Sequence, residues 1–365
     1  MNRTSDHDVM DQARGWAARG EGVAVATVVG TQRSAPRPIG TRMVIGEGGG
    51  IDGSVSGGCV EGAVVEAAEA LLAGGAPQLL EYGISDEQAW DVGLQCGGAI
   101  SVWLERWEPS AGTPDDCLLE AARDGRRAAV VTLLDGERAG AKLFVDAAGE
   151  RHGTLGADDL DAAAAAAADT LLWEERSAVR EVLGQAVFVD VVAPPPRLFV
   201  FGAVDYATAL CALAAQLGWR PFVIDPRARF AQPERFPAAE EVVAKWPQEA
   251  FTQLGGIDAA TAIVVLTHDP KLDDAALELA LRSPAAYVGA MGSRRAQESR
   301  RERLLALGLG EDELARIAAP VGLDLGAQSA EETALSIMAE IVALRRGRTG
   351  GRLRDASGRI HATAP

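Results

Sequence analysis

Cys59 lies in a glycine-rich segment of a kind that can present a reactive thiolate. It follows Ser54-Val55-Ser56-Gly57-Gly58 and precedes an apolar run typical of a helix. Such loops can turn their N–H groups inward to hold an anion, and a helix N-terminus stabilises a thiolate placed in its first turn. Arg33 and Arg37 add two cations on a proline-containing loop upstream. We therefore predict a functional thiolate at Cys59 in the first helical turn, rather than a small buried residue behind a tight turn.

Cys96 has a similar setting, in Gly93-Leu94-Gln95-Cys96-Gly97-Gly98. The two diglycine–cysteine segments either line one cleft or form two unrelated tight turns, and the sequence leaves both open. Cys117 and Cys211 lie on the apolar faces of expected helices, where a cysteine packs as a small hydrophobic residue. No two cysteines are spaced as C-x-x-C and the histidines are scattered, so we expect no dedicated metal site built by the protein.

A second group of candidate residues lies in the C-terminal half, around Gly202-Ala203-Val204-Asp205. Asp225 follows Gly202 after 23 residues, where a dinucleotide-binding fold places the acid that binds the ribose. Val204 replaces the glycine that lets a pyrophosphate approach, and Asp205 puts a negative charge at the helix start. A purely structural Rossmann-like turn, a working dinucleotide site and a site for another ligand all stay open.

Two further motifs, Thr267-His268-Asp269-Pro270 and Gly292-Ser293, follow expected strands of the same half. The carboxyl ends of parallel strands form the edge at which open α/β sheets bind ligands. Because Arg294 and Arg295 follow Gly292-Ser293, this motif indicates a second anion cradle at a helix start. His268 is either a hydrogen-bonded structural residue or a contact to that ligand.

Composition limits the classes of partner. The 365 residues include 52 acidic and 35 basic side chains, which gives a net charge of −17 and argues against general nucleic-acid binding. The apolar runs are rich in alanine or broken by glycine, so we expect no membrane-spanning helix. The N-terminus has no apolar core region or cleavage site, which argues against a secretory signal and for a cytoplasmic protein.

The hydrophobic pattern divides the chain into four parts. Residues 1–108 form an N-terminal domain with predicted helices over 8–18 and 60–72, and with strands over 23–29, 41–45, 51–55, 78–82 and 99–107. Residues 109–193 form a middle α+β segment that continues this half, with strands over 128–134, 141–145 and 186–192 and an alanine-rich helix around 162–168. After Pro194-Pro195-Pro196, strands and helices alternate over 197–345, which predicts a Rossmann-like, doubly wound parallel sheet. The basic tail, residues 346–365, is expected to be disordered.

Together these motifs resemble the XdhC/CoxI family, the maturation factors of xanthine dehydrogenase-like and carbon monoxide dehydrogenase-like molybdenum hydroxylases. The resemblance covers roughly residues 10–105 and 197–345 and rests on short strings that occur in the same order. These strings are Ser34-Ala35-Pro36-Arg37-Pro38, Ser54-Val55-Ser56-Gly57-Gly58-Cys59-Val60-Glu61, Leu94-Gln95-Cys96-Gly97-Gly98, Asp225-Pro226-Arg227, Arg235-Phe236-Pro237, Thr267-His268-Asp269-Pro270, Tyr287-Val288-Gly289-Ala290-Met291-Gly292-Ser293-Arg294, Pro320-Val321-Gly322-Leu323-Asp324-Leu325-Gly326 and Ser336-Ile337-Met338-Ala339-Glu340-Ile341.

The resemblance implies an accessory chaperone rather than an enzyme. Such proteins bind the molybdenum cofactor, in its molybdopterin or dinucleotide form, and protect it while a cysteine desulfurase supplies sulfur. They then deliver it to an apo molybdenum hydroxylase, and family members form homodimers. The family's cofactor-linked cysteine falls on Cys59, and a soft thiolate suits contact with molybdenum or sulfur; Cys96 is the second candidate. The expected cofactor-binding residues are Arg33, Arg37, Ser54, Ser56, Gly57, Gly58, Cys59, Gly97, Gly98, Gly202, Asp225, His268, Gly292 and Ser293.

The chain departs from the family pattern at two places. The usual Gly-Ala-Gly-His of the Rossmann turn is Gly202-Ala203-Val204-Asp205 here, which puts nucleotide binding in question, and Arg33 replaces a commoner glycine. The alternative function is an NAD(P)-dependent oxidoreductase using the C-terminal domain. Against it stand the altered turn and the lack of a recognisable catalytic dyad. A third possibility is a scaffold that docks an apo-hydroxylase without contacting the cofactor.

Overall fold

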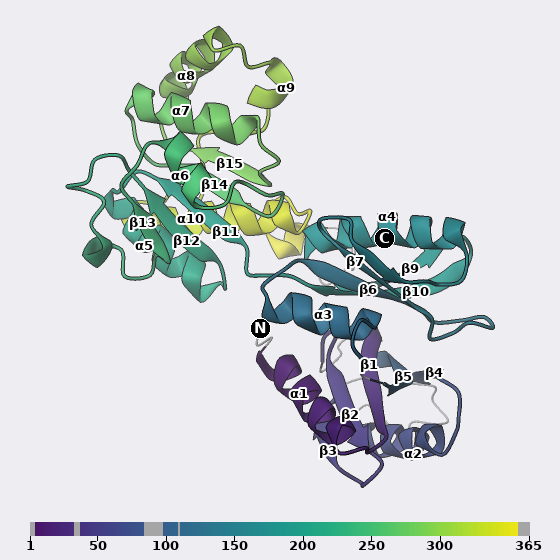
Figure 1. The fold of residues 1–365 in the computed structure, drawn as a ribbon. Coiled ribbons are helices and arrows are strands. Elements are labelled where there is room, and N and C mark those ends of the chain that lie inside the picture. Colours follow the sequence, from purple (N-terminus) through teal and green to yellow (C-terminus); the bar gives the residue numbers. More distant parts are fainter. Residues whose placement is uncertain (1–3, 33–36, 84–97, 109, 357–365) are drawn as a thin grey trace. The chain divides into compact units, whose positions relative to one another are not determined.

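The computed structural model describes residues 4–32, 37–83, 98–108 and 110–356. It divides into two units, residues 1–194 and 195–365 (Figure 1). The predicted mixed α/β fold with a Rossmann-like sheet in the C-terminal half is confirmed. Within the described ranges, no helix combines the length and apolar character needed to cross a bilayer.

The first unit contains two five-stranded antiparallel sheets with corresponding strand orders, β3-β2-β1-β5-β4 and β8-β7-β6-β10-β9. The first sheet and its helices comprise α1 (Thr4–Ala18), β1 (Val23–Gln32), β2 (Arg42–Gly46), β3 (Ile51–Gly53), α2 (Glu61–Leu72), β4 (Gln78–Tyr82) and β5 (Ala99–Trp107). The second comprises α3 (Pro114–Arg123), β6 (Ala128–Leu133), β7 (Lys142–Asp146), β8 (Arg151–Gly153), α4 (Asp158–Glu174), β9 (Ala178–Val182) and β10 (Gln185–Val192).

Each sheet has one helix on its outer face, α2 on the first and α4 on the second (Figure 1). Side chains alternate between the faces of a strand, so Ala24 and Ala26 of β1 pack with α2, while Val23 and Val25 pack with Trp16 of α1. Burial on both faces explains why β1 reads as a continuous apolar run rather than as an alternating one.

The second half of the first unit repeats the pairing of the first half at a spacing of 100 residues. Met43 pairs with Gly53 in the first sheet, and Leu143 pairs with Gly153 in the second. The edge strands β4 and β9 keep the same spacing, since they span residues 78–82 and 178–182. The middle segment, in which the sequence showed no motif, therefore has the topology of the N-terminal domain.

Two reciprocal ion pairs join the inner faces of these sheets. Arg42 of β2 pairs with Asp190 of β10, and Lys142 of β7 pairs with Glu105 of β5 at 2.7 Å. The two bases occupy corresponding register positions, as do the two acids. Such reciprocity is typical of an interface between two copies related by a two-fold axis. A small, otherwise uncharged cavity lies at this interface, and the charged residues in its lining are these four and Asp115, all of which are ion-paired.

The second unit has a six-stranded parallel sheet in the order β13-β12-β11-β14-β15-β16, the doubly wound order of a dinucleotide-binding fold. Its strands are β11 (Arg197–Phe201), β12 (Arg220–Ile224), β13 (Glu241–Val243), β14 (Ala262–Val265), β15 (Tyr287–Ala290) and β16 (Ile317–Ala318). Its helices are α5 (Asp205–Gln216), α6 (Pro247–Gln253), α7 (Pro270–Leu281), α8 (Arg294–Ala306), α9 (Glu311–Leu314) and α10 (Ala330–Arg345), with short 3-10 turns η1 (Pro233–Arg235) and η2 (Leu353–Asp355).

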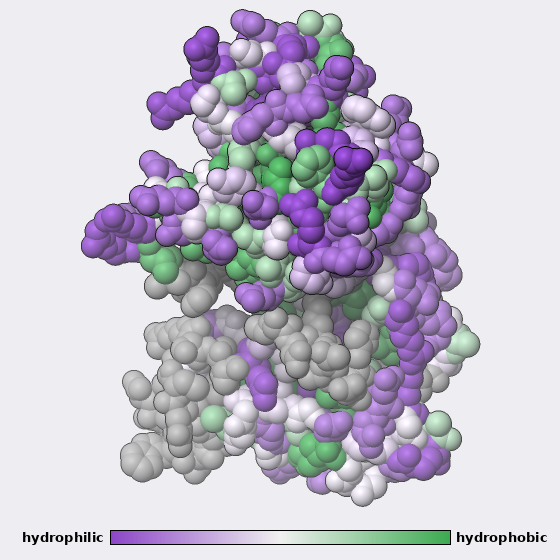
Figure 2. Space-filling view, turned by 90° about the vertical axis from the view of Figure 1, so that its left-hand side faces the viewer, coloured by the Kyte–Doolittle hydropathy of each residue, from purple (hydrophilic) through white to green (hydrophobic). Residues whose placement is uncertain are grey.

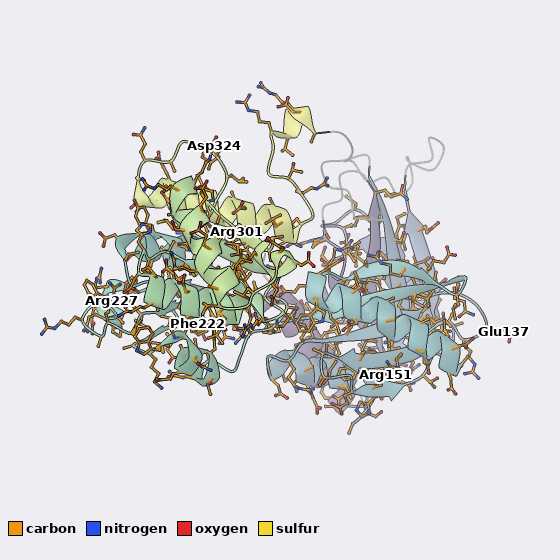
Figure 3. All side chains as sticks on the ribbon, turned by 90° about the horizontal axis from the view of Figure 1, so that it is seen from above. Glu137, Arg151, Phe222, Arg227, Arg301 and Asp324 are labelled. Carbon is orange, nitrogen blue, oxygen red and sulfur yellow. The ribbon has the colours of Figure 1, made fainter. Side chains whose placement is uncertain are left out.

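The central strand β11 is buried on both faces of this sheet. Phe199 and Phe201 pack with α6 and α7, while Leu198 and Val200 pack with α5 and α10. Phe222 of β12, labelled in Figure 3, packs edge-on against Phe199 with 5.4 Å between ring centroids. Hydrophilic side chains predominate over the described part of the face drawn in Figure 2, where hydrophobic ones form separate patches.

Candidate functional site

Three connections of the first sheet leave it at one edge. Gln32 at the end of β1 pairs with Ala99 at the start of β5, and Tyr82 at the end of β4 pairs with Ile100. Strand β3 runs parallel to β1, since both are antiparallel to β2, so the segment after Gly53 leaves the sheet in the same direction. Gln32, Ser54 and Gly98, the described residues at or next to the predicted site segments, therefore lie at the same end of the sheet.

The structure describes only some of the predicted residues in these segments. Arg33, Cys96 and Gly97 lie outside the described residues. Arg37 is exposed on the β1–β2 connection, and Gly98 directly precedes β5. The Ser54–Cys59 segment is described throughout and carries the geometry of the site.

Cys59 lies before α2, on backbone that is not helical. The helix begins at Glu61 with Val60 as its N-cap, so the prediction of Cys59 in the first helical turn is wrong. The physical reason is that Gly57 and Gly58 adopt φ angles of +78° and +115°, which delay the start of the helix. The thiol is partly buried against the core between α2 and the sheet.

The described residues leave space beside the two glycines. Among them, no atom would lie within 4 Å of a Cβ atom built at Gly57 or Gly58. Glycine is therefore needed here for its backbone conformation and not for close packing. The amide of Cys59 donates to Ser56 Oγ at 3.0 Å, which fixes the backbone on the other side of the loop.

The amides of this loop converge on the carboxylate of Glu61. The N–H groups of Ser56, Gly57 and Gly58 donate to its two oxygens at 2.8, 3.0 and 2.9 Å. The hydroxyls of Ser54 and Ser56 donate to it at 2.7 and 2.5 Å. The amides therefore turn inward, as expected for an anion nest, but the anion that they hold is a side chain of the same loop.

Glu61 belongs to the predicted motif, but the sequence alone indicated no role for it. Burial opposes its ionisation, yet the hydrogen bonds from Ser56, Ser54 and the backbone outweigh this and lower the pKa of Glu61 to about 2. A cofactor phosphate would have to displace this carboxylate to reach the same amides. The sequence signal for this role is a glutamate two residues after Cys59, since acids near helix N-termini bind free amides.

In the second unit, Asp225 is engaged by the protein itself. It is fully buried, accepts the Ala203 amide at 2.9 Å and accepts the Arg227 guanidinium at 2.9 and 2.7 Å. Burial opposes its charge, but the bonds from Arg227 and Ala203 lower the pKa of Asp225 below its ordinary value. Figure 3 shows Arg227 at the margin of the second unit. Both oxygens of the predicted ribose acid are therefore hydrogen-bonded internally.

The Gly202 turn is closed by a second arginine. Arg235 donates to the Ala203 carbonyl at 3.2 Å and lies 3.4 Å from the Asp205 carboxylate. Gly202 itself has a φ of +110°, and a Cβ there would collide with Thr267. Backbone conformation and packing together explain the glycine, and both the amide and the carbonyl of Ala203 have protein partners.

We expect no saturable binding of NAD(P) or ATP below about 1 mM, which corresponds to roughly −4 kcal/mol. The reason is that Val204 and Asp205 oppose a pyrophosphate while Asp225 is held by Arg227. Isothermal titration calorimetry measures this affinity, with Val204→Gly/Asp205→Gly as the variant that removes both obstacles. Micromolar binding by the unchanged protein would show that the turn still accepts a nucleotide.

His268, Gly292 and Ser293 share one edge of the parallel sheet, because they follow the neighbouring strands β14 and β15. His268 and Ser293 are exposed, and Ser293 caps α8 by accepting the Ala296 amide at 3.2 Å. Beneath them a buried ion pair joins Asp273 and Arg300 at 3.1 Å. A buried ion pair therefore lies beneath the predicted cradle, and the serine hydroxyl of the cradle is used as the cap of α8.

Burial disfavours the thiolate form of the other described cysteines. Burial raises the pKa of Cys211 to about 12, and burial together with nearby acids raises that of Cys117. The predicted core packing is confirmed for Cys211, whereas Cys117 is only partly buried. Among the described residues, no three His, Cys, Asp or Glu side chains are grouped so that they could bind a metal ion.

Both units of the chain match known protein families. The XdhC Rossmann domain family matches residues 198–341. The XdhC and CoxI family matches residues 16–83 and, separately, residues 121–182, which agrees with the repeated topology. The chain belongs to the XdhC and CoxI family, as the sequence motifs predicted.

Two curated relatives align over most of this chain. A protein of Bacillus subtilis (strain 168), named as a probable xanthine dehydrogenase subunit, is 26% identical over 328 residues, 89% of this chain and 94% of the relative. The molybdenum cofactor insertion chaperone PaoD of Escherichia coli (strain K12) is 28% identical over 327 residues, 89% and 84% of the two chains. A crystal structure described as a xanthine dehydrogenase from Bacillus halodurans shares the fold, with a TM-score of 0.60 at 24% identity, covering 97% of this chain and 98% of that chain.

Proposed function

We propose that this protein binds the molybdenum cofactor, protects it during sulfuration and delivers it to an apo molybdenum hydroxylase of the xanthine dehydrogenase or carbon monoxide dehydrogenase type. Family membership and the alignment with the insertion chaperone PaoD support a role in cofactor insertion. The structural observation that carries the proposal is the Cys59 turn, in which a partly buried thiol follows two glycines that no other described side chain covers.

The chemistry of the site residues fits such a cargo. The cofactor consists of a molybdenum–dithiolene centre on a phosphorylated pterin, and a thiolate is a soft ligand suited to the metal or to a transferred sulfur. Cys59 would supply that contact. Because Glu61 holds the loop amides, the phosphate would be bound by exposed guanidinium groups such as that of Arg37.

The proposal includes two protein partners. A cysteine desulfurase would supply the sulfur and an apo hydroxylase would receive the loaded cofactor, in the cytoplasm, with the chaperone as a homodimer. The competing oxidoreductase function is not favoured, because Asp225 has its oxygens bound by Arg227 and Ala203.

Cys59→Ser tests the proposal directly. It keeps the size and hydrogen bonding of the side chain but removes the soft ligand, so we expect at least about a tenfold loss of cofactor affinity, roughly 1.4 kcal/mol. Retained molybdenum and pterin fluorescence after gel filtration, and activation of an apo hydroxylase, measure the loss. Melting near that of the unchanged protein is expected, because Cys59 lies at the margin of the core.

Cys211→Ala is the matched control for this experiment. The Cys211 thiol is fully buried, so its loss should lower stability while cofactor retention per folded molecule stays unchanged. Full retention and full client activation by Cys59→Ser would contradict the thiolate role and make Cys96 the next candidate.

A further inference from the structure

We propose that Glu61 is a positioning residue, which keeps the backbone before α2 unwound and so places the Cys59 thiol against the margin of the sheet. The inference rests on the proposed function in taking Cys59 as the working thiol. Its evidence is independent of that function, because it comes from comparing the two repeats of the first unit.

The second repeat contains a simpler form of the same hydrogen-bonded loop. Asp161, 100 residues after Glu61, accepts the Thr154 hydroxyl and the Leu155 amide, both at 2.7 Å. Thr154 corresponds to Ser54, whose hydroxyl donates to Glu61 at the same distance. Both repeats therefore have a carboxylate that accepts hydrogen bonds from the loop between the strand and the helix.

The repeats differ in where the helix begins. Helix α4 begins at Asp158, so Asp161 lies within its first turn, whereas α2 begins only at Glu61 itself. Equal numbers of residues separate Gly53 from Glu61 and Gly153 from Asp161. The helix of the first repeat therefore begins one turn later within a segment of the same length. Cys59 corresponds to Asp159, which is helical in the second repeat.

Unwinding this turn creates a need for hydrogen-bond acceptors. Amides at the start of a helix lack intrahelical partners, and those of buried residues such as Ser56 and Val60 must be satisfied by another group. Glu61 accepts the amides of Ser56, Gly57, Gly58 and Val60, the last at 3.2 Å. Asp161, one methylene shorter, accepts only the Leu155 amide of its loop. The longer side chain and the two left-handed glycines together account for the unwound geometry.

Glu61→Gln should loosen the loop while keeping its side-chain volume, because it removes the charge and one acceptor oxygen. We expect at least a tenfold loss of hydrogen-exchange protection at the amides of Gly57 and Gly58. We also expect faster alkylation of Cys59 by a neutral maleimide, since the thiol leaves its partly buried position, together with weaker retention of molybdenum cofactor. Loss of a nearby charge alone would not expose the amides.

Asp161→Asn is the matched control, since it removes the same charge from the corresponding position of the other repeat. It should loosen its own loop and leave the Cys59 alkylation rate and cofactor retention unchanged. Glu61→Asp keeps the charge with a shorter reach and should give intermediate protection, which tests the role even if Glu61→Gln folds poorly.

Unchanged amide protection in both Glu61 variants would overturn the proposal. So would normal cofactor retention by a Glu61→Gln protein whose loop has lost protection. Neither result bears on whether Cys59 contacts the cofactor, which Cys59→Ser decides separately.

Discussion

Replacing Lys142 with methionine is expected to lower the free energy of unfolding by about 3–5 kcal/mol, the range found when one partner of a buried ion pair is removed. Lys142 Nζ lies 2.7 Å from Glu105 and 2.6 Å from Asp115, and the side chains of Lys142 and Glu105 are only 13% and 12% exposed. Methionine keeps the apolar stem but leaves a buried carboxylate without its cation. Urea denaturation followed by tryptophan fluorescence measures the loss.

The loss should become smaller as the pH is lowered. Burial raises the pKa of Glu105 even though Lys142 opposes the shift, and removing Lys142 raises that pKa further. A carboxyl group whose pKa is higher in the folded state binds more protons when folded, so acid stabilises the folded variant relative to the unfolded chain. We therefore expect the free energies of unfolding of the variant and the unchanged protein to differ less at pH 5 than at pH 7.

The exposed Lys271 supplies the control for this prediction. Lys271→Met removes the same charge from the surface and should change the free energy of unfolding by no more than about 0.5 kcal/mol. A Lys142→Met effect below about 1 kcal/mol, or one that is constant with pH, would show that the reciprocal ion pairs do not hold the two repeats together.

The Rossmann-like unit could be predicted because its strands are buried on both faces. Burial of this kind requires nearly continuous apolar runs such as 262–266, and the alternation of such runs with helices specifies a parallel sheet. The repeat in the first unit could not be found in the same way. Strand β8 is exposed at every residue and has no apolar run, and the repeats share pairing register rather than motifs.

In the candidate site, too, the positions of residues could be predicted from the sequence, but their hydrogen-bond partners could not. Spacing predicted an acid at the end of β12, and Asp225 lies there, but spacing does not reveal that Arg227 binds both of its oxygens. The glycine–serine loop was predicted to hold an anion, and its amides do so through Glu61. Composition identifies a loop that can bind a carboxylate or phosphate, whereas only the three-dimensional structure shows which group fills it.

The equivalence of the repeats predicts that Gly53→Ala and Gly153→Ala both destabilise the protein, by about 2–4 kcal/mol each. The two glycines have φ angles of +78° and +84°, and a Cβ at either would collide with a backbone carbonyl oxygen, of Arg42 or of Lys142; at Gly153 it would also lie 2.8 Å from Pro114 Cγ. Gly149→Ala is the control, because its φ of +87° is equally unfavourable but its Cβ would meet no atom of the described residues within 4 Å. It should cost about 1 kcal/mol in the same denaturation experiment.

The effect on Cys59 should distinguish Gly53→Ala from Gly153→Ala. Gly53 directly precedes the Ser54–Cys59 loop, so Gly53→Ala should change the maleimide alkylation rate of Cys59 and weaken cofactor retention, whereas Gly153→Ala should leave both unchanged. A loss of stability from only one of the two variants would contradict the equivalence of the repeats. Losses from both, with an effect on Cys59 from Gly53→Ala alone, would mean that both repeats maintain the fold and that only the first affects the thiol.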